Sequence, residues 1–76
     1  SGIYLQLGAF ASQQNAEAFH GEIAPRLADF PRAPQVKHVD GLYRVQIGPY
    51  FDEATAKTDA SELKNRLNLS PVLGSR

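Results

Sequence analysis

Two glutamines at equivalent positions of an internal repeat are the side chains best placed for ligand chemistry. Gln6 lies in residues 3–10, and Gln46 lies 40 positions later in the matching residues 43–50. A carboxamide offers two N–H donors and a carbonyl acceptor, which suits the hydroxyl and acetamido groups of a polymer. One glutamine on a strand surface is usually only solvated. The recurrence leaves binding and simple solvation as the two interpretations of the pair.

Two cations and a small apolar group accompany the glutamines. Arg44 and Lys37 can hold a carboxylate, Arg44 in bidentate fashion, although both can equally be ordinary surface charges. Val39 and Leu42 form a small exposed patch, and Tyr4 adds a phenol ring. Flat apolar surface beside directional donors and acceptors favours a polymeric ligand with hydroxyl and acetamido groups.

The composition excludes several kinds of catalytic chemistry. The chain contains no cysteine, which rules out disulfides, thiol nucleophiles and cysteine-held metal centres. His20 and His38 have no adjacent carboxylate cluster, so a metal site is not expected. Asp52 and Glu53 are typical of a helix start rather than of an acid–base pair. The sequence therefore predicts a binding module without cofactors or catalytic residues.

Length and charge narrow the choice of partner. The 76 residues suffice for one domain, and 8 Lys and Arg balance 8 Asp and Glu. A formal charge of zero disfavours binding to nucleic acids or to anionic membranes. No stretch approaches the length of a membrane span, and any targeting segment is expected upstream of Ser1.

Hydrophobic alternation predicts two strands, in residues 3–8 and 42–48, that position these side chains. One face of each strand carries the core residues, which are Leu5, Leu7, Val45 and Ile47. The opposite face is expected to be open to solvent and to carry Tyr4, Gln6, Gly8, Lys37, Val39, Leu42, Arg44 and Gln46.

Helix and turn signals complete the order of elements. Ser12 and Asp52 are typical N-caps, each followed by an apolar helical stripe. Pro25 predicts a kink or a distorted last turn in the first helix. The pair at residues 40–41, Asp-Gly, predicts a type I′ turn that places Val39 opposite Leu42.

A last short strand is expected after Pro71. The resulting order, β-α-β-β-α-β, predicts an α+β fold of the ferredoxin-like type. Its four-stranded, antiparallel-type sheet would have both helices on one face.

The doubled motif Gln-(Leu/Ile)-Gly-(Ala/Pro)-(Phe/Tyr), at residues 6–10 and 46–50, resembles the SPOR (sporulation-related repeat) domain over essentially all of residues 1–76. The resemblance implies a periplasmic domain that binds peptidoglycan glycan strands lacking stem peptides and targets its parent protein to the division septum. It also implies a monomer without direct membrane contact. The parent would resemble a septal lytic transglycosylase, an outer-membrane lipoprotein with its catalytic residues upstream.

By position, the resemblance assigns ligand contacts to Gln6, Ala9 and Leu42. Strongly binding family members often have a serine at the Ala9 position and an aromatic residue at the Leu42 position, so this sequence departs from the family there. Together with the residues chosen from their chemistry, the predicted glycan-binding set is Tyr4, Gln6, Ala9, Lys37, Val39, Leu42, Arg44 and Gln46.

Two other functions are compatible with the same sequence. A protein–protein interaction module would use the patch of Val39 and Leu42. The element order is also that of RNA-recognition domains, which stack bases on exposed aromatic side chains. Because only Tyr4 offers such a platform and the net charge is zero, the RNA interpretation is the weaker of the two.

Overall fold

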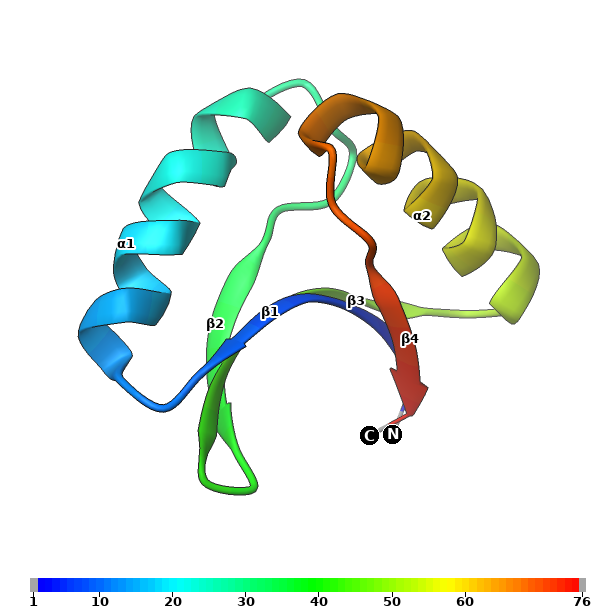
Figure 1. Cartoon of the computed structure of the whole chain (residues 1–76). Coiled ribbons are helices and arrows are strands. Elements are labelled where there is room, and N and C mark those ends of the chain that lie inside the picture. Colours follow the sequence, from blue (N-terminus) through cyan, green and yellow to red (C-terminus); the bar gives the residue numbers. More distant parts are fainter. Residues whose placement is uncertain (1, 76) are drawn as a thin grey trace.

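The elements follow the predicted order and form one antiparallel sheet. The computed structural model describes residues 2–75. In chain order the elements are β1 (Ile3–Phe10), α1 (Gln13–Ile23), the short 3₁₀ helix η1 (Ala24–Leu27), β2 (Gln35–Val39), β3 (Leu42–Tyr50), α2 (Glu53–Leu67) and β4 (Val72–Ser75). The strand order is β2-β3-β1-β4 with every pair antiparallel. Both helices cover the same side of the sheet (Figure 1), which confirms the predicted fold class.

The core lies between the sheet and the two helices. Leu5, Val45 and Ile47 are fully buried on the sheet side, and Leu7 is nearly so, as the alternation predicted. The helices add the buried residues Ala16, Ile23, Ala56, Leu63 and Leu67. Within residues 2–75 no helix is both long and apolar enough to cross a bilayer. The sheet surface turned away from the helices is called the outer face below.

Each helix begins at the predicted cap. The Ser12 hydroxyl accepts a hydrogen bond from the Asn15 N–H at 3.3 Å, and Asp52 Oδ1 accepts one from the Thr55 N–H at 2.7 Å. The bond from Thr55 favours the ionised carboxyl, so the pKa of Asp52 lies below its usual value. These bonds satisfy amides that the first helical turn leaves without partners.

Pro25 changes the helix type rather than ending the helical path. The α-helix α1 stops at Ile23, and the chain continues as η1 with Pro25 in its first turn. A proline has no N–H to donate, and in a first turn none is needed. The 3₁₀ turn brings Leu27 into the core with 3% exposure, which confirms the expected distorted last turn.

The hairpin between β2 and β3 has the predicted turn and register. Asp40 and Gly41 both have positive φ, 54° and 79°, as a type I′ turn requires. Val39 pairs with Leu42, and Lys37 pairs with Arg44. The register of every residue of β2 follows from this turn.

A β-bulge in β1 overturns one placement made from alternation. The β1–β3 register shifts between Gln6 and Gly8, so that Gly8 pairs with Val45 on the helix side. A Cβ on Gly8 would lie 3.0 Å from Phe10 Cε2. The expectation that Gly8 lies on the outer face was therefore wrong, because one extra residue reverses the side of every later residue in the strand.

Candidate functional site

The outer face is organised as rows that run across the strands, because residues paired on antiparallel strands point to the same side. Nearest the hairpin turn is the apolar row, which consists of Val39 and Leu42. Next comes the cation row, which consists of Lys37, Arg44 and Ala9. The glutamine row then crosses all four strands and consists of Gln35, Gln46, Gln6 and Val72.

The bulge in β1 also decides where Ala9 lies. Simple alternation from Leu5 and Leu7 would put Ala9 on the helix side. The register shift pairs Ala9 with Arg44 instead, and its side chain is exposed. The structure thus places Ala9 beside the cations of the outer face.

Arg44 is held in position by two hydrogen bonds from its own guanidinium. Its Nη1 donates to Gln6 Oε1 at 2.7 Å, and its Nε donates to the carbonyl oxygen of Val39 at 3.2 Å. The guanidinium is partly buried and spans β1 and β3. Donors on Nη1 and Nη2 remain for a ligand, since an arginine has five N–H groups in a planar fork.

The outer face is positively charged although the chain is neutral. Lys37 and Arg44 are the only Lys, Arg, Asp or Glu residues in the four strands. The ion pairs of residues 2–75 lie elsewhere, in the helices and their connections, as between Arg66 and Asp29 at 2.7 Å. Neither outer-face cation is neutralised by an acidic side chain in this part of the chain.

Gln46 lies in the middle of the outer face but is not open to solvent. It is 3% exposed, and its Oε1 has no hydrogen-bond partner among residues 2–75. The expectation of an exposed Gln46 amide was wrong. The reason is that Gln46 is flanked on both sides by the long side chains of its paired glutamines, Gln35 on β2 and Gln6 on β1.

Tyr4 lies against the backbone of β3 beyond the glutamine row. A Cβ on Gly48 would lie 2.6 Å from Tyr4 Cδ2, and Gly48 has a φ of 151°. The tyrosine ring therefore uses the space that the glycine leaves. Tyr4 is half-buried, so part of its side chain remains accessible.

Two residues of the outer face were not predicted. Gln35 is exposed at the start of β2, and extending the hairpin register by one pair would have placed it opposite Gln46. Val72 is 58% exposed and pairs with Gln6. No local signal gives the pairing of β4 with β1, so Val72 could be placed only from the tertiary structure.

The histidines lie apart from the outer face. His20 Nε2 is 3.0 Å from the carbonyl oxygen of Pro34, and the His38 ring stacks on Tyr43 with centroids 4.2 Å apart. The residues described by the structure contain no group of three or more His, Asp or Glu side chains placed to hold a metal ion.

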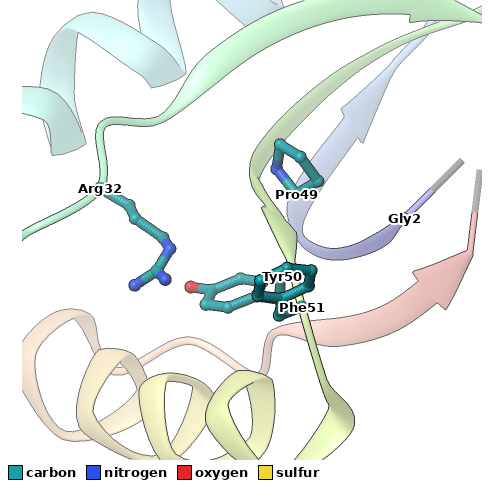
Figure 2. Close-up of a pocket in the computed structure, with 5 residues that line it drawn as sticks. All are labelled: Gly2, Arg32, Pro49, Tyr50 and Phe51. Carbon is teal, nitrogen blue, oxygen red and sulfur yellow. The ribbon is translucent and has the colours of Figure 1, made fainter.

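A cavity of about 380 Å³ at the far end of β3 contains none of the predicted site residues. Its lining residues are Gly2, Arg32, Pro49, Tyr50 and Phe51 (Figure 2). The Tyr50 hydroxyl donates to Asp59 Oδ2 at 2.8 Å, and Arg32 lies over the Tyr50 ring at 4.5 Å. Burial, followed by this bond to Asp59, raises the pKa of Tyr50. These groups satisfy one another, so the cavity is less suited to a polar ligand than the outer face.

A helix-backed sheet with an uncovered, polar and cationic face defines a small binding domain. The family model of the SPOR domain matches residues 1–73, and the chain belongs to this family. The expected family membership is thereby confirmed.

Two solved structures share the fold. The solution structure of the peptidoglycan binding domain of the B. subtilis cell wall lytic enzyme CwlC is 33% identical, with a TM-score of 0.68, over 99% of this chain and 92% of that one. The crystal structure of the RlpA SPOR domain from Pseudomonas aeruginosa is 25% identical, with a TM-score of 0.65, over 99% of this chain and 100% of that one. No curated protein sequence matches the chain.

Proposed function

We propose that this domain binds peptidoglycan through its outer face and selects glycan strands that have lost their stem peptides. Membership of the SPOR family and the likeness to a peptidoglycan binding domain support the ligand class. The outer face supports the selection of peptide-free glycan strands, since it combines cations, amides and apolar side chains on a surface that no helix covers (Figure 1).

The observation that carries the proposal is the fixed and unneutralised guanidinium of Arg44. Removal of a stem peptide leaves a free lactyl carboxylate on the muramic acid residue. Arg44, oriented by Gln6 and by the Val39 carbonyl, presents its remaining donors to such a carboxylate, with Lys37 beside it. Charge-assisted hydrogen bonds of this kind are about twice as strong as neutral ones.

Other side chains of the outer face would supply the remaining contacts with the glycan. Gln6 and Gln35 offer amide N–H groups to acetamido and hydroxyl oxygens of the sugars. Val39 and Leu42, together with Tyr4, offer apolar surface to the sugar rings. A stem peptide would add bulk where the glycan strand lies against the sheet, so the same surface excludes glycan strands that keep their stem peptides.

Ala9 and Leu42 make this surface less polar and less aromatic than the family pattern implies. Ala9 is exposed next to Arg44 but has no donor, and Leu42 supplies aliphatic contact only. The ligand would therefore depend more on Arg44 and on the amides than on these two positions.

The domain's role in its parent protein follows from this binding. We place it as a single monomeric module of residues 1–76, in the periplasm and enriched at the division septum, where peptide-free strands would recruit it. The parent would be an outer-membrane lipoprotein with lytic transglycosylase activity carried by another part of the protein. The domain itself makes no membrane contact and cleaves no glycan.

Co-sedimentation with murein sacculi tests the proposal. We expect binding to increase after an amidase has removed the stem peptides, and we expect the Arg44→Gln variant to lose most of that increase. Equal binding of the wild type to treated and untreated sacculi would contradict strand selection.

Purified peptide-free glycan strands separate the competing functions. Binding to these strands with no other protein present is expected and excludes a requirement for a protein partner. Tight, salt-sensitive binding to single-stranded RNA in place of glycan would instead support the RNA-recognition alternative.

A further inference from the structure

The glutamine row contains a buried acceptor that the contacts above do not use. Gln46 is 3% exposed, and its Oε1 is the buried side-chain atom without a hydrogen-bond partner in residues 2–75. A buried acceptor without a donor destabilises the folded state relative to an apolar group of the same shape. Its position in the middle of the outer face therefore calls for a physical reason.

Side chains of the outer face, and not another element, separate Gln46 from solvent. Both helices lie on the opposite side of the sheet (Figure 1). Gln46 pairs with Gln6 on one side and with Gln35 on the other. Gln6 is fixed, because its Oε1 accepts the 2.7 Å bond from Arg44. Gln35 is exposed on the edge strand β2, so it is the neighbour that can change rotamer.

We propose that Gln46 Oε1 accepts the acetamido N–H of a bound sugar once the Gln35 side chain has turned aside. The inference rests on the proposed function, since it needs a glycan on the outer face. Neighbouring strands are about 4.8 Å apart, which is the spacing at which stacked amides hydrogen-bond in glutamine ladders. An acetamido group that takes the place left by the Gln35 side chain can therefore donate its N–H to Gln46 Oε1.

This arrangement makes Gln46 a selector for sugars with a free acetamido N–H. A sugar without the acetamido N–H leaves the acceptor unpaired in the complex, as it is in the free domain. A leucine at position 46 has a similar shape and no polar atom. The Gln46→Leu variant is therefore expected to melt at the wild-type temperature or above it, and to lose the preference for strands with a free acetamido N–H.

The test compares two proteins on two ligands. Wild type and Gln46→Leu are titrated with peptide-free glycan strands and with analogue strands whose acetamido nitrogens carry a methyl group in place of the hydrogen. We expect N-methylation to lower the affinity of the wild type by about three- to tenfold more than that of the variant. Both proteins keep Arg44 and Lys37 and the methyl group adds no charge, so the other effects of the modification cancel between them.

The outcomes distinguish failure of the inference about Gln46 from failure of the proposed function. Equal losses for the two proteins overturn the role of Gln46 and leave the proposed function in place. No wild-type binding to either ligand overturns both. Should Gln46→Leu fail to fold, Gln46→Met is titrated in its place. If both variants melt well below the wild type, the buried amide stabilises the fold and the inference is wrong.

Discussion

At the scale of single residues, the outer face depends on the bond between Gln6 and Arg44. The Gln6 carbonyl faces Arg44 Nη1 at 2.7 Å, so one amide orients the charge that the ligand would meet. The bond joins β1 to β3 without contributing to the core, which lies on the other side of the sheet. Changes at these two positions should therefore alter binding more than folding.

Substitution of Gln6 by alanine is predicted to weaken glycan binding while leaving the domain folded. The variant loses its own amide contact and releases Arg44, so affinity should fall by about three- to tenfold. The free energy of unfolding should fall by less than about 1 kcal/mol, because no core volume is removed. Thermal melting and glycan titration measure the two effects.

Leu5→Ala is the matched control from the other face of the same strand. Leu5 is fully buried, and the cavity left by alanine should destabilise the domain by about 2–5 kcal/mol. If Gln6→Ala unfolds the domain, or leaves affinity unchanged, the assignment of faces or of the contact is wrong.

The Arg44→Gln variant should distinguish acidic from neutral ligands. Without the guanidinium, affinity for strands with free lactyl carboxylates is predicted to fall by about tenfold or more. Affinity for neutral N-acetylglucosamine oligomers should change much less. Parallel titration of both ligands measures the difference, and an equal loss on the two would show that Arg44 does not bind a carboxylate.

At the scale of elements, small backbone irregularities set the composition of the outer face. The bulge after Gln6 brings Ala9 beside Arg44, and the second register shift lets Tyr4 lie against Gly48. Bulges of this kind redirect side chains at sites in many sheets. The helices lie on the other side of the sheet (Figure 1), and their N-caps fix where each helix starts.

Gly48→Ala is predicted to destabilise the domain by about 1–3 kcal/mol. The added Cβ would lie 2.6 Å from Tyr4 Cδ2 and 2.9 Å from the Ile3 carbonyl oxygen, at a φ that disfavours alanine. Gly21→Ala is the control, since no atom lies within 4 Å of the new Cβ. That change in helix α1 should stabilise the domain by about 0.5–1 kcal/mol. Equal melting temperatures for the two variants would contradict the contact at Gly48.

The cap of α2 gives a pH-dependent prediction. The bond from Thr55 lowers the pKa of Asp52, so its stabilising effect is complete above the unfolded pKa of about 3.9. The effect is lost as the pH falls through the lower, folded pKa. At pH 6 the wild type should have a higher melting temperature than Asp52→Asn, because only the carboxylate carries a charge that interacts with the helix dipole. The difference in melting temperature should vanish near pH 2. A constant difference across this range would rule out the ionised cap.

At the scale of the whole molecule, charge is separated between two sides. Acidic and basic residues pair with one another along the helices and connections, as Arg32 does with Asp59 at 3.4 Å and Arg66 with Asp29. The sheet keeps two cations without acidic partners in residues 2–75. A chain with no net charge thus presents a positive surface to one side only.

Phe51→Ala should separate the outer face from the cavity at the end of β3. Phe51 is fully exposed and lines that cavity (Figure 2), but it belongs to none of the three rows. Its removal is predicted to change the free energy of unfolding by less than about 0.5 kcal/mol and to leave glycan affinity unchanged. A loss of glycan binding comparable to that of Arg44→Gln would move the ligand to this end of the molecule.

The sequence by itself determined the features that depend on neighbouring residues. The caps at Ser12 and Asp52, the turn at Asp40 and the distorted helix end at Pro25 were all predicted, and each is set by local hydrogen bonding or steric limits. Alternation also identified Leu5 and the other core residues of the strands.

Only the tertiary structure decided the features that depend on which strands pair and in what register. The bulge that moves Gly8 to the helix side and Ala9 to the outer face exists only between β1 and β3. Val72 reaches the glutamine row because β4 pairs with β1. Gln46 has the same local pattern as Gln6, yet Gln46 is buried and Gln6 is half-buried, because two glutamine side chains flank Gln46 whereas Gln6 has Val72 on one side. Burial and strand register depend on residues that are distant in the sequence, so local periodicity does not reveal them.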